Sequence, residues 1–171
     1  MGAAVLCGKG CLRSGVGLLT THIPSCGLDI VQVAIPEAMC SIDRHSFHFS
    51  SIPDLSVFSC VGIGPGLGVT IETKEALVGL LNEVNVPLVM DADALNIISK
   101  APDLLDLIPE YSILTPHPKE FERLVGSWKD SEERLAKQIT FSQRYKCIVV
   151  LKDANTVISS PDGKRYFKGS N

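Results

Sequence analysis

The sequence lacks any long unbroken run of apolar residues and any excess of basic charge. Hydrophobic residues make up 45% of its 171 residues, yet no window approaches the roughly 20 apolar residues of a membrane span. The net charge of -3 offers no basic field to a nucleic-acid backbone or an anionic membrane surface. The apolar opening segment is interrupted by Lys9 and Arg13 and has no basic region ahead of an unbroken apolar stretch, unlike a signal peptide. These absences predict a soluble, cytoplasmic protein that binds neither nucleic acid nor membrane.

Metal-binding cysteine patterns are also missing. The six cysteines show neither a CxxC pair nor the dense spacing of a disulfide-stapled scaffold, and no histidine stands at ligand spacing from them. Cys7 and Cys11 would share one face of a helix, but their apolar surroundings favour core packing over a metal site. We therefore expect no metal site and expect the thiols to be buried in the core.

The sequence does contain an alternation of helical and strand-like patterns, without repeats. This alternation is typical of an α/β fold with a mostly parallel central sheet, and the length suits a single domain. The predicted strands occupy residues 18–23, 30–35, 57–63, 88–91, 112–115 and 147–151, followed by a hairpin of residues 156–159 and 165–167. Helices are predicted over residues 2–14 and 70–85, after Asp93 and Pro118, and from Asp130 to Tyr145. The segment 43–53 is predicted to be a loop.

In open α/β sheets, ligands bind where strands end at their carboxyl edge, so the residues that follow each predicted strand are the candidates for function. The first such segment is the loop that contains Gly64, Gly66 and Gly68. Glycines there would let backbone N–H groups approach an anionic or planar ligand closely. A tight turn from strand to helix needs glycine without any ligand, so both explanations stay open. The spacing differs from that of the dinucleotide-binding fingerprint.

Two carboxylates follow the next strand. Asp93 is expected to be the N-cap of the following helix, which accounts for it structurally. Asp91 ends a buried apolar strand, where a carboxylate is costly unless it is hydrogen-bonded or faces the ligand crevice. The pattern therefore favours a binding role for Asp91.

A histidine between two prolines follows the third strand. Pro118 suits the first helical position, which would place His117 at the cap and at the mouth of the crevice. A single histidine is usually structural, but the flanking prolines fix its direction and favour a role in the site. Glu120 has a structural explanation, as a charge that complements the helix dipole.

A lysine follows the fourth strand. Lys152 offers a cation for a phosphate, and Asn155 and Thr156 add hydrogen-bond donors. The alternative is a solvated turn before a hairpin, and this segment alone does not decide between the two.

Taken together and in this order, these segments resemble the NAD(P)H-hydrate dehydratase family along the whole chain. No single string is specific, whereas their combination in the family's order is. The matching strings are Gly2–Leu6, Leu12–Leu18, Gly64–Gly68, Asp91–Asn96, Leu114–Pro118 and Leu151-Lys152.

The resemblance implies a three-layer ribokinase-like fold and a reaction in which ADP or ATP, with Mg2+, drives the dehydration of the S epimer of hydrated NADH or NADPH. The hydroxyl of the nicotinamide hydrate would be phosphorylated and phosphate then eliminated. By position, Ala3 or Ala4, the Gly64–Gly68 loop and His117 match substrate-contacting residues. The segment that matches the adenine-nucleotide contacts comprises Lys152, Asp153, Ala154, Asn155 and Thr156. The family is typically homo-oligomeric, and the absence of a targeting segment favours ADP over ATP.

The sequence departs from the family at three places. Asp153 stands where the family usually has glycine, which puts a negative charge near the expected phosphate. At the amino end, the family has a further strand and a glycine-rich turn before the match begins. At the carboxyl end, it continues past Asn171 into a Gly-Ser-Gly-Asp segment with the catalytic base. We therefore expect residues 1–171 to form a single incomplete domain that is inactive alone.

Two alternatives to the repair lyase stay open. One is a ribokinase-type kinase for a vitamin precursor or a sugar, because that superfamily shares the fold and the nucleotide site. The other is a folded or oligomer-forming piece without activity, because a phosphoryl-transfer site loses most of its rate without its base and anion hole.

Overall fold

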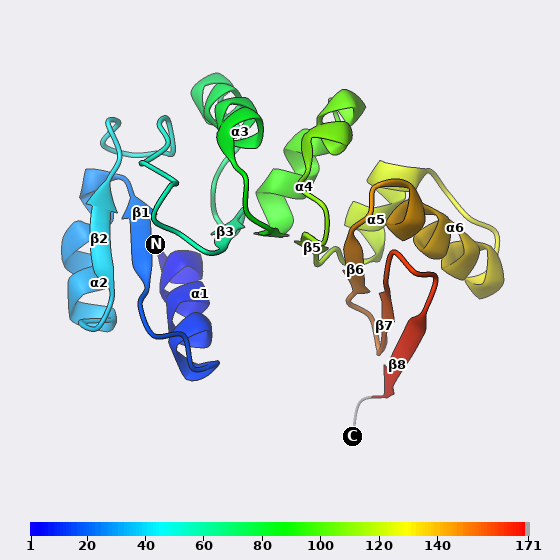
Figure 1. The fold of residues 1–171 in the computed structure, drawn as a ribbon. Coiled ribbons are helices and arrows are strands. Elements are labelled where there is room, and N and C mark those ends of the chain that lie inside the picture. The colour runs from blue at the N-terminus through cyan, green and yellow to red at the C-terminus, as the bar shows by residue number, and fades with distance from the viewer. Residues whose placement is uncertain (170–171) are drawn as a thin grey trace. The chain divides into compact units, whose positions relative to one another are not determined.

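The computed structural model describes residues 1–169, which pack into two compact units (Figure 1). Unit 1 consists of Met1–Val57 and Pro65–Leu80. Unit 2 consists of Phe58–Gly64 and of the chain from Leu81 onward. Each unit has its own β-sheet, and the organisation of residues 1–171 as a single domain stays a prediction.

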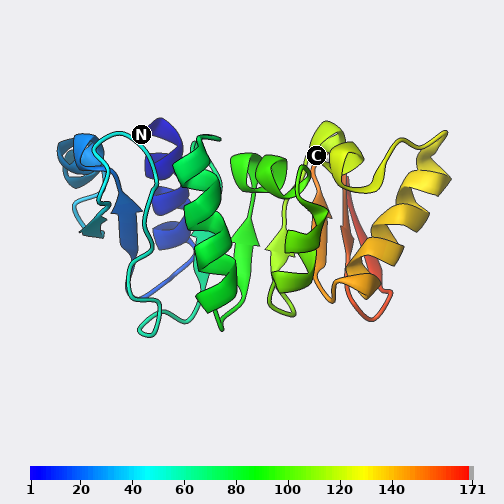
Figure 2. The same ribbon diagram turned by 90° about the horizontal axis from the view of Figure 1, so that it is seen from above.

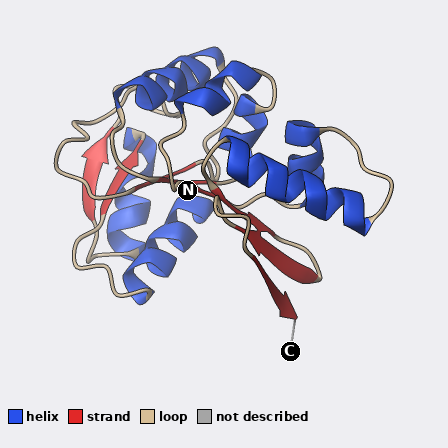
Figure 3. Cartoon of the chain, turned by 45° about the vertical axis from the view of Figure 1, so that its right-hand side comes forward, coloured by secondary structure: helices blue, strands red, loops and turns tan. Residues whose placement is uncertain are grey.

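Unit 1 contains a two-stranded parallel sheet with helices. The strands pair in register, from Thr20 opposite Met39 to Ile23 opposite Ile42. Its elements are α1 (Gly2–Arg13), β1 (Thr20–Ile23), the 3-10 helix η1 (Ser25–Gly27), α2 (Leu28–Ala34), β2 (Met39–Ile42) and the first part of α3 (Ile71–Glu83). The segment 43–60, which follows β2, contains neither helix nor strand, as predicted for residues 43–53 (Figure 3).

The predicted strand 30–35 is wrong, because most of this segment belongs to helix α2. Its β-branched residues suggested a strand, but burial follows a helical period. Val31 and Ile35 are buried four residues apart, whereas Ile30 and Val33 are 50% and 85% exposed. The error hid β2, which the sequence analysis did not predict.

Unit 2 contains a six-stranded sheet in the order β3-β4-β5-β6-β7-β8. The pairs from β3 to β6 are parallel, and the last two pairs are antiparallel. Helices α4, α5 and α6 lie over the same face of this sheet (Figures 1 and 2). The elements are β3 (Val61–Ile63), β4 (Leu88–Met90), α4 (Ala92–Ile98), the 3-10 helix η2 (Pro102–Leu107), β5 (Ile113–Leu114), α5 (Pro118–Val125), α6 (Ser131–Arg144), β6 (Ile148–Leu151), β7 (Asn155–Ser159) and β8 (Arg165–Gly169).

The strands of unit 2 alternate between buried and less buried residues. Leu88 and Met90 are fully buried and Val89 between them is 36% exposed. Val149 and Leu151 are buried in the same alternating way on β6. Burial of each such side chain contributes roughly 1.5–3 kcal/mol, so one face of the sheet carries most of the core of this unit. The strand predicted over residues 57–63 is observed only at residues 61–63, as β3, where Ile63 is buried and Gly62 is exposed.

Several sequence signals for helix and turn positions are confirmed. Asp130 caps α6 by accepting hydrogen bonds from the backbone N–H groups of Glu132 at 3.0 Å and Glu133 at 2.9 Å. The hairpin of β7 and β8 turns at Gly163, whose φ is +79°. None of the helices within residues 1–169 has both the length and the apolar character needed to cross a membrane.

The expectation of buried thiols holds for one cysteine of the six, all of which lie in the described residues. Cys147 is buried, and desolvation raises the pKa of its thiol to about 12. Cys7, Cys26 and Cys60 are exposed, and Cys11 and Cys40 are half-buried. A cysteine with apolar neighbours in the sequence is not buried when its segment forms a surface helix or a loop.

Candidate functional site

The carboxyl ends of β3, β4, β5 and β6 meet at one edge of the sheet in unit 2. The N–H of Asp91 donates to the carbonyl of Ile63 at 3.1 Å, and the N–H of Thr115 donates to the carbonyl of Met90 at 3.0 Å. The N–H of Lys152 donates to the carbonyl of Pro116 at 2.9 Å. Residues that the sequence placed after separate strands are therefore neighbours at this edge.

An ion pair lies at this edge. The Nζ of Lys152 lies 2.7 Å from the Oδ1 of Asp91, although the two residues are 61 positions apart in the sequence. The side chains are 44% and 28% exposed, so the pair adds at most about 1 kcal/mol to stability. Its importance is positional, because the carboxylate holds the ammonium group at the end of β6.

Asp91, and not Asp93, is the N-cap of α4, which corrects the sequence prediction. The Asp91 side chain makes no capping hydrogen bond and accepts from Lys152 instead. The next residue, Ala92, has a φ of +48°, in the left-handed region that costs a residue with a Cβ atom about 1 kcal/mol or more. The chain thus leaves β4 through a strained turn at the residues that carry the ion pair.

Gly64 is required by the backbone of unit 2. Its φ is +129°, and a Cβ atom there would lie 1.8 Å from the carbonyl oxygen of Asp91. The structural explanation for this glycine is therefore sufficient without any ligand. Its predicted role in substrate binding stays a prediction.

His117 is the N-cap of α5, as predicted, and Pro118 occupies the first helical position. The Nδ1 of His117 accepts hydrogen bonds from the N–H groups of Lys119 at 3.1 Å and Glu120 at 3.3 Å. The Glu120 carboxylate accepts from the N–H of His117 at 2.9 Å, which completes a capping box. Because Nδ1 is an acceptor, the proton of the neutral ring is on Nε2. The ring is 47% exposed, and its Nε2 lies 3.4 Å from the Oε1 of Glu120, so this carboxylate already faces the Nε2–H.

The segment 152–156 follows β6 and is exposed up to Asn155. The Oδ2 of Asp153 lies 2.8 Å from the Nη1 of Arg134 on α6. The N–H of Ala154, followed by the Arg134 guanidinium, lowers the pKa of the Asp153 carboxyl. The negative charge that departs from the family is thus paired.

A cavity of about 340 Å³ lies beside this segment in unit 2. Its volume falls in the range of small-molecule pockets. Apolar side chains of α6, β7 and β8 form much of its wall, and polar ones complete it. The lining residues are Ser131, Glu132, Arg134, Leu135, Gln138, Asn155, Val157 and Phe167.

The remaining predicted substrate residues lie in unit 1, where the glycine loop packs against α1. Gly66 and Gly68 have φ angles of +70° and +82°. A Cβ atom on Gly66 would lie 3.3 Å from the Cβ of Ala3. Ala4 and Gly66 line a smaller cavity of about 100 Å³, together with Met1, His22, Ile23, Pro24, Asp43, Phe47, His48, Phe49, Pro65 and Leu67.

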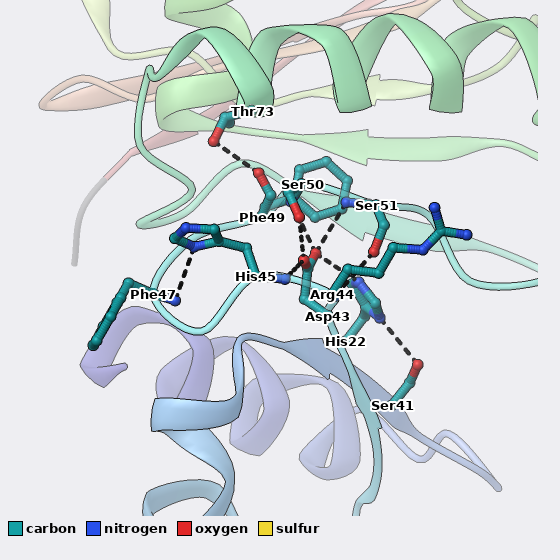
Figure 4. Close-up of polar contacts among 10 residues, drawn as sticks. All are labelled: His22, Ser41, Asp43, Arg44, His45, Phe47, Phe49, Ser50, Ser51 and Thr73. Carbon is teal, nitrogen blue, oxygen red and sulfur yellow. Dashed lines mark hydrogen bonds and ion pairs between the residues drawn. The ribbon is translucent and has the colours of Figure 1, made fainter.

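A polar cluster beside this cavity was missed by the sequence analysis (Figure 4). The buried carboxylate of Asp43 lies 3.0 Å from the Nε2 of His22. It also accepts hydrogen bonds from the N–H of His45 at 2.8 Å, from the N–H of Ser50 at 2.9 Å and its hydroxyl at 2.5 Å, and from the N–H of Ser51 at 3.1 Å. Desolvation raises the pKa of this carboxyl, but the hydrogen bonds together hold it well below its usual range. Asp43 therefore fixes the loop that carries His45, Phe47 and His48.

One sequence signal could have revealed this cluster. Asp43 accepts from the N–H two residues later, which is the pattern of an Asx turn. It also comes directly after β2, as Asp91 comes directly after β4. Because β2 was not predicted, Asp43 was not placed at a strand end.

The model for the NAD(P)H-hydrate dehydratase family matches residues 1–168. The chain belongs to the NAD(P)H-hydrate dehydratase family. The members of this family are enzymes, and the order of the matching strings in the sequence had implied the same membership.

Curated relatives of this NAD(P)H-hydrate dehydratase chain are much longer than it is. It is 32% identical over 177 residues to the bifunctional NAD(P)H-hydrate repair enzyme Nnr of Moorella thermoacetica, covering 97% of this chain and 33% of that protein. It is 36% identical over 174 residues to the enzyme of the same name from Escherichia coli K12, covering 99% and 32%. The chain thus spans about a third of the length of these relatives.

Solved structures confirm the ribokinase-like α/β fold. An ADP/ATP-dependent NAD(P)H-hydrate dehydratase from Bacillus subtilis, co-crystallized with ATP/Mg2+ and soaked with CoA, matches with a TM-score of 0.76 and 26% identity. That match covers 97% of this chain and 60% of the other. A ribokinase-like superfamily protein from Enterococcus faecalis has a TM-score of 0.78 at 22% identity, covering 99% and 59%, and supports the fold alone.

Within residues 1–169, no group of three or more His, Cys, Asp or Glu residues is placed to hold a metal ion. The carboxylate of Asp91 is engaged by Lys152.

Proposed function

We propose that this chain is part of a repair enzyme that dehydrates the S epimer of hydrated NADH or NADPH, with ADP as the phosphoryl donor. The observation that carries the proposal is the ion pair of Asp91 and Lys152 at the carboxyl edge of a parallel sheet. Membership in the family supports the choice of substrate. A fixed cation at this edge is suited to an anionic phosphate.

The proposed reaction balances with the nucleotide as co-substrate. The terminal phosphoryl group of ADP passes to the hydroxyl oxygen of the hydrated ring, the hydroxyl proton passes to the catalytic base of the family's Gly-Ser-Gly-Asp segment, and AMP leaves. The ring C–O bond then breaks, and phosphate departs with the bonding electron pair. Loss of a ring proton restores the double bond of NADH. With ATP, the same steps leave ADP.

The chain's own residues would bind and orient the two substrates. Lys152 would contact the transferred phosphate, and residues 153–156 would contact the adenine nucleotide beside the cavity of about 340 Å³. The partly exposed ring of His117 would contact the hydrated dinucleotide, with its Nδ1 engaged in the cap and its Nε2 facing Glu120. In unit 1, Ala3, Ala4 and the loop at Gly66 are proposed as substrate-contacting residues because they match such positions of the family. Homo-oligomerisation and a cytoplasmic location stay predictions.

Binding and turnover test the proposal separately. We expect residues 1–171 to bind the S epimer of hydrated NADH and ADP in calorimetry, with weaker binding of the R epimer. We expect turnover, followed as the return of NADH absorbance, from a form that also carries the family's Gly-Ser-Gly-Asp segment. Equal affinity for the two epimers, or no binding of either epimer, would contradict the substrate assignment. Faster turnover with ATP than with ADP would overturn the choice of donor.

The same assays address the kinase alternative. A ribokinase-type kinase would leave a stable phosphorylated product and would not release free phosphate. Phosphorylation of a vitamin precursor or a sugar, without binding of hydrated NADH, would replace the repair function with this alternative.

A further inference from the structure

Helix α6 holds the turn that carries Lys152. This turn, residues 152–154, joins β6 to β7, and α6 packs against both strands (Figure 1). All three elements belong to unit 2. Gln138 of α6 is fully buried, and its Nε2 donates to the carbonyl of Val149 on β6 at 3.1 Å and to that of Val157 on β7 at 3.0 Å. The strands on both sides of the turn are therefore fixed to the same helix.

Arg134 reaches the turn itself. It lies four residues before Gln138, so the two side chains leave α6 on the same face. The Nη1 of Arg134 lies 2.8 Å from the Oδ2 of Asp153. The Oδ1 of the same carboxylate accepts a hydrogen bond from the N–H of Ala154 at 2.8 Å. Both oxygens of Asp153 are thus engaged, one by α6 and one by the turn.

The charges of the two ion pairs in this region balance only when Arg134 is present. Lys152 is bound to Asp91, so in the described part of the chain Arg134 is the cation that neutralises Asp153. Without the guanidinium, two carboxylates would stand against one ammonium group. The excess negative charge would repel the phosphate groups of a nucleotide at residues 152–156.

The pair of Arg134 and Asp153 matters more for a charged ligand than for the stability of the fold. The two side chains are 22% and 38% exposed, and ion pairs at such exposure add little to the free energy of unfolding. In physiological salt, however, an unpaired charge still acts on another charge over about 8 Å. Loss of the guanidinium should therefore weaken the binding of phosphate groups without unfolding the protein.

From this geometry we propose that Arg134 is a positioning residue of the nucleotide site, which keeps the Asp153 carboxylate bound to α6 so that it does not repel the phosphate groups of the nucleotide. The proposal rests on the proposed function, because it requires that residues 152–156 contact the nucleotide. Arg134 acts through Asp153 and not through a contact with the ligand. Its effect should therefore disappear once residue 153 carries no charge.

The test compares the binding of ADP and of adenosine to residues 1–171 by calorimetry, since adenosine has the same base and sugar but no phosphate. We expect Arg134→Met to weaken ADP binding about three- to tenfold and to leave adenosine binding unchanged. Arg134→Lys keeps the positive charge and should retain most of the affinity for ADP. The double variant Arg134→Met with Asp153→Asn should regain the ADP affinity of the unmodified protein. Asparagine keeps an acceptor for the N–H of Ala154 but carries no charge.

Arg144→Met is the matched control, because it makes the same substitution at the last residue of α6, where the guanidinium lies over the ring of Tyr145. Its affinity for both ligands should match that of the unmodified protein. Unchanged ADP binding by Arg134→Met, an equal loss of adenosine binding, or a loss of ADP binding that persists in the double variant would overturn this proposal and leave the proposed function intact. Failure of the unmodified protein to bind ADP would overturn both.

Discussion

Replacing Gly64 with alanine tests whether unit 2 is built around a missing Cβ atom at the end of β3. The added atom would lie 1.8 Å from the carbonyl oxygen of Asp91 and 3.1 Å from the Cβ of Ala94. The first contact is with backbone, so no side-chain rotation relieves it. Either the pairing of β3 with β4 or the strained turn at Ala92 must shift.

Two other glycines of the same region calibrate the effect. Gly68 has a φ of +82° with open space around it, so alanine there should cost about 1–2 kcal/mol, the price of a left-handed conformation. Gly62 has neither a positive φ nor a neighbour within 4 Å, so alanine there should change stability by less than about 0.5 kcal/mol. Gly64→Ala should cost at least about 3 kcal/mol, because strain and overlap with backbone combine. A loss of that size is a large part of the total stability of about 5–15 kcal/mol typical of a folded protein.

Urea denaturation of the three variants, followed by circular dichroism, gives the free energies of unfolding. The expected order of destabilisation is Gly64→Ala, then Gly68→Ala, then Gly62→Ala. A Gly64→Ala variant as stable as Gly68→Ala would refute the argument that the Asp91 carbonyl excludes a side chain. In that case the glycine would be better explained by ligand binding.

Three further predictions concern charged and reactive groups. Lys152→Met should weaken ADP binding at least about tenfold in calorimetry, while unfolding free energy changes by less than about 1 kcal/mol, because the ion pair is partly exposed; unchanged affinity would remove Lys152 from the nucleotide site. The pKa of Asp43 is lowered in the folded state, so its contribution to stability is complete above the unfolded value near 4 and is lost as pH falls toward the folded value. Asp43→Asn should therefore flatten the acid limb of a stability profile measured by urea denaturation, and an unchanged limb would contradict the pKa direction. Cys147 has a pKa of about 12 and is buried, so iodoacetamide followed by mass spectrometry should label Cys60 in the native protein and Cys147 only after unfolding; early labelling of Cys147 would contradict its burial.

Local sequence patterns predicted the elements that depend on contacts between residues close together in the sequence. His117 and Pro118 were placed at the start of α5 because a capping box is a short-range arrangement. The ends of β4 and β6 were placed in the same way, and the rule that parallel strands end at a common edge brought Asp91 and Lys152 to the same region. Their direct ion pair could not be predicted, because it depends on side-chain positions 61 residues apart.

The residues that were missed depend on the register of distant strands. His22 lies opposite Ser41 in the pairing of β1 with β2, and this register brings its ring to Asp43. If residues 30–35 are predicted to be a strand, β1 is paired with that segment instead of with β2. The contact between His22 and Asp43 is then not predicted. Helix α2 forms there because tertiary packing buries Val31 and Ile35 on one helical face, which overrides the strand propensity of the segment.

Asp153 shows how the structure changes the meaning of a departure from the family pattern. In the sequence, this aspartate stands where glycine is usual and predicts repulsion of a nucleotide phosphate. In the structure, Arg134 reaches it from α6, 19 positions earlier, and the two opposite charges give the segment no added net charge. The repulsion expected from the sequence is therefore offset at the same place in space by a residue on another element. Lys152 is paired with Asp91, and the adjacent Asp153 is paired with Arg134. The two carboxylates therefore do not compete for the same cation.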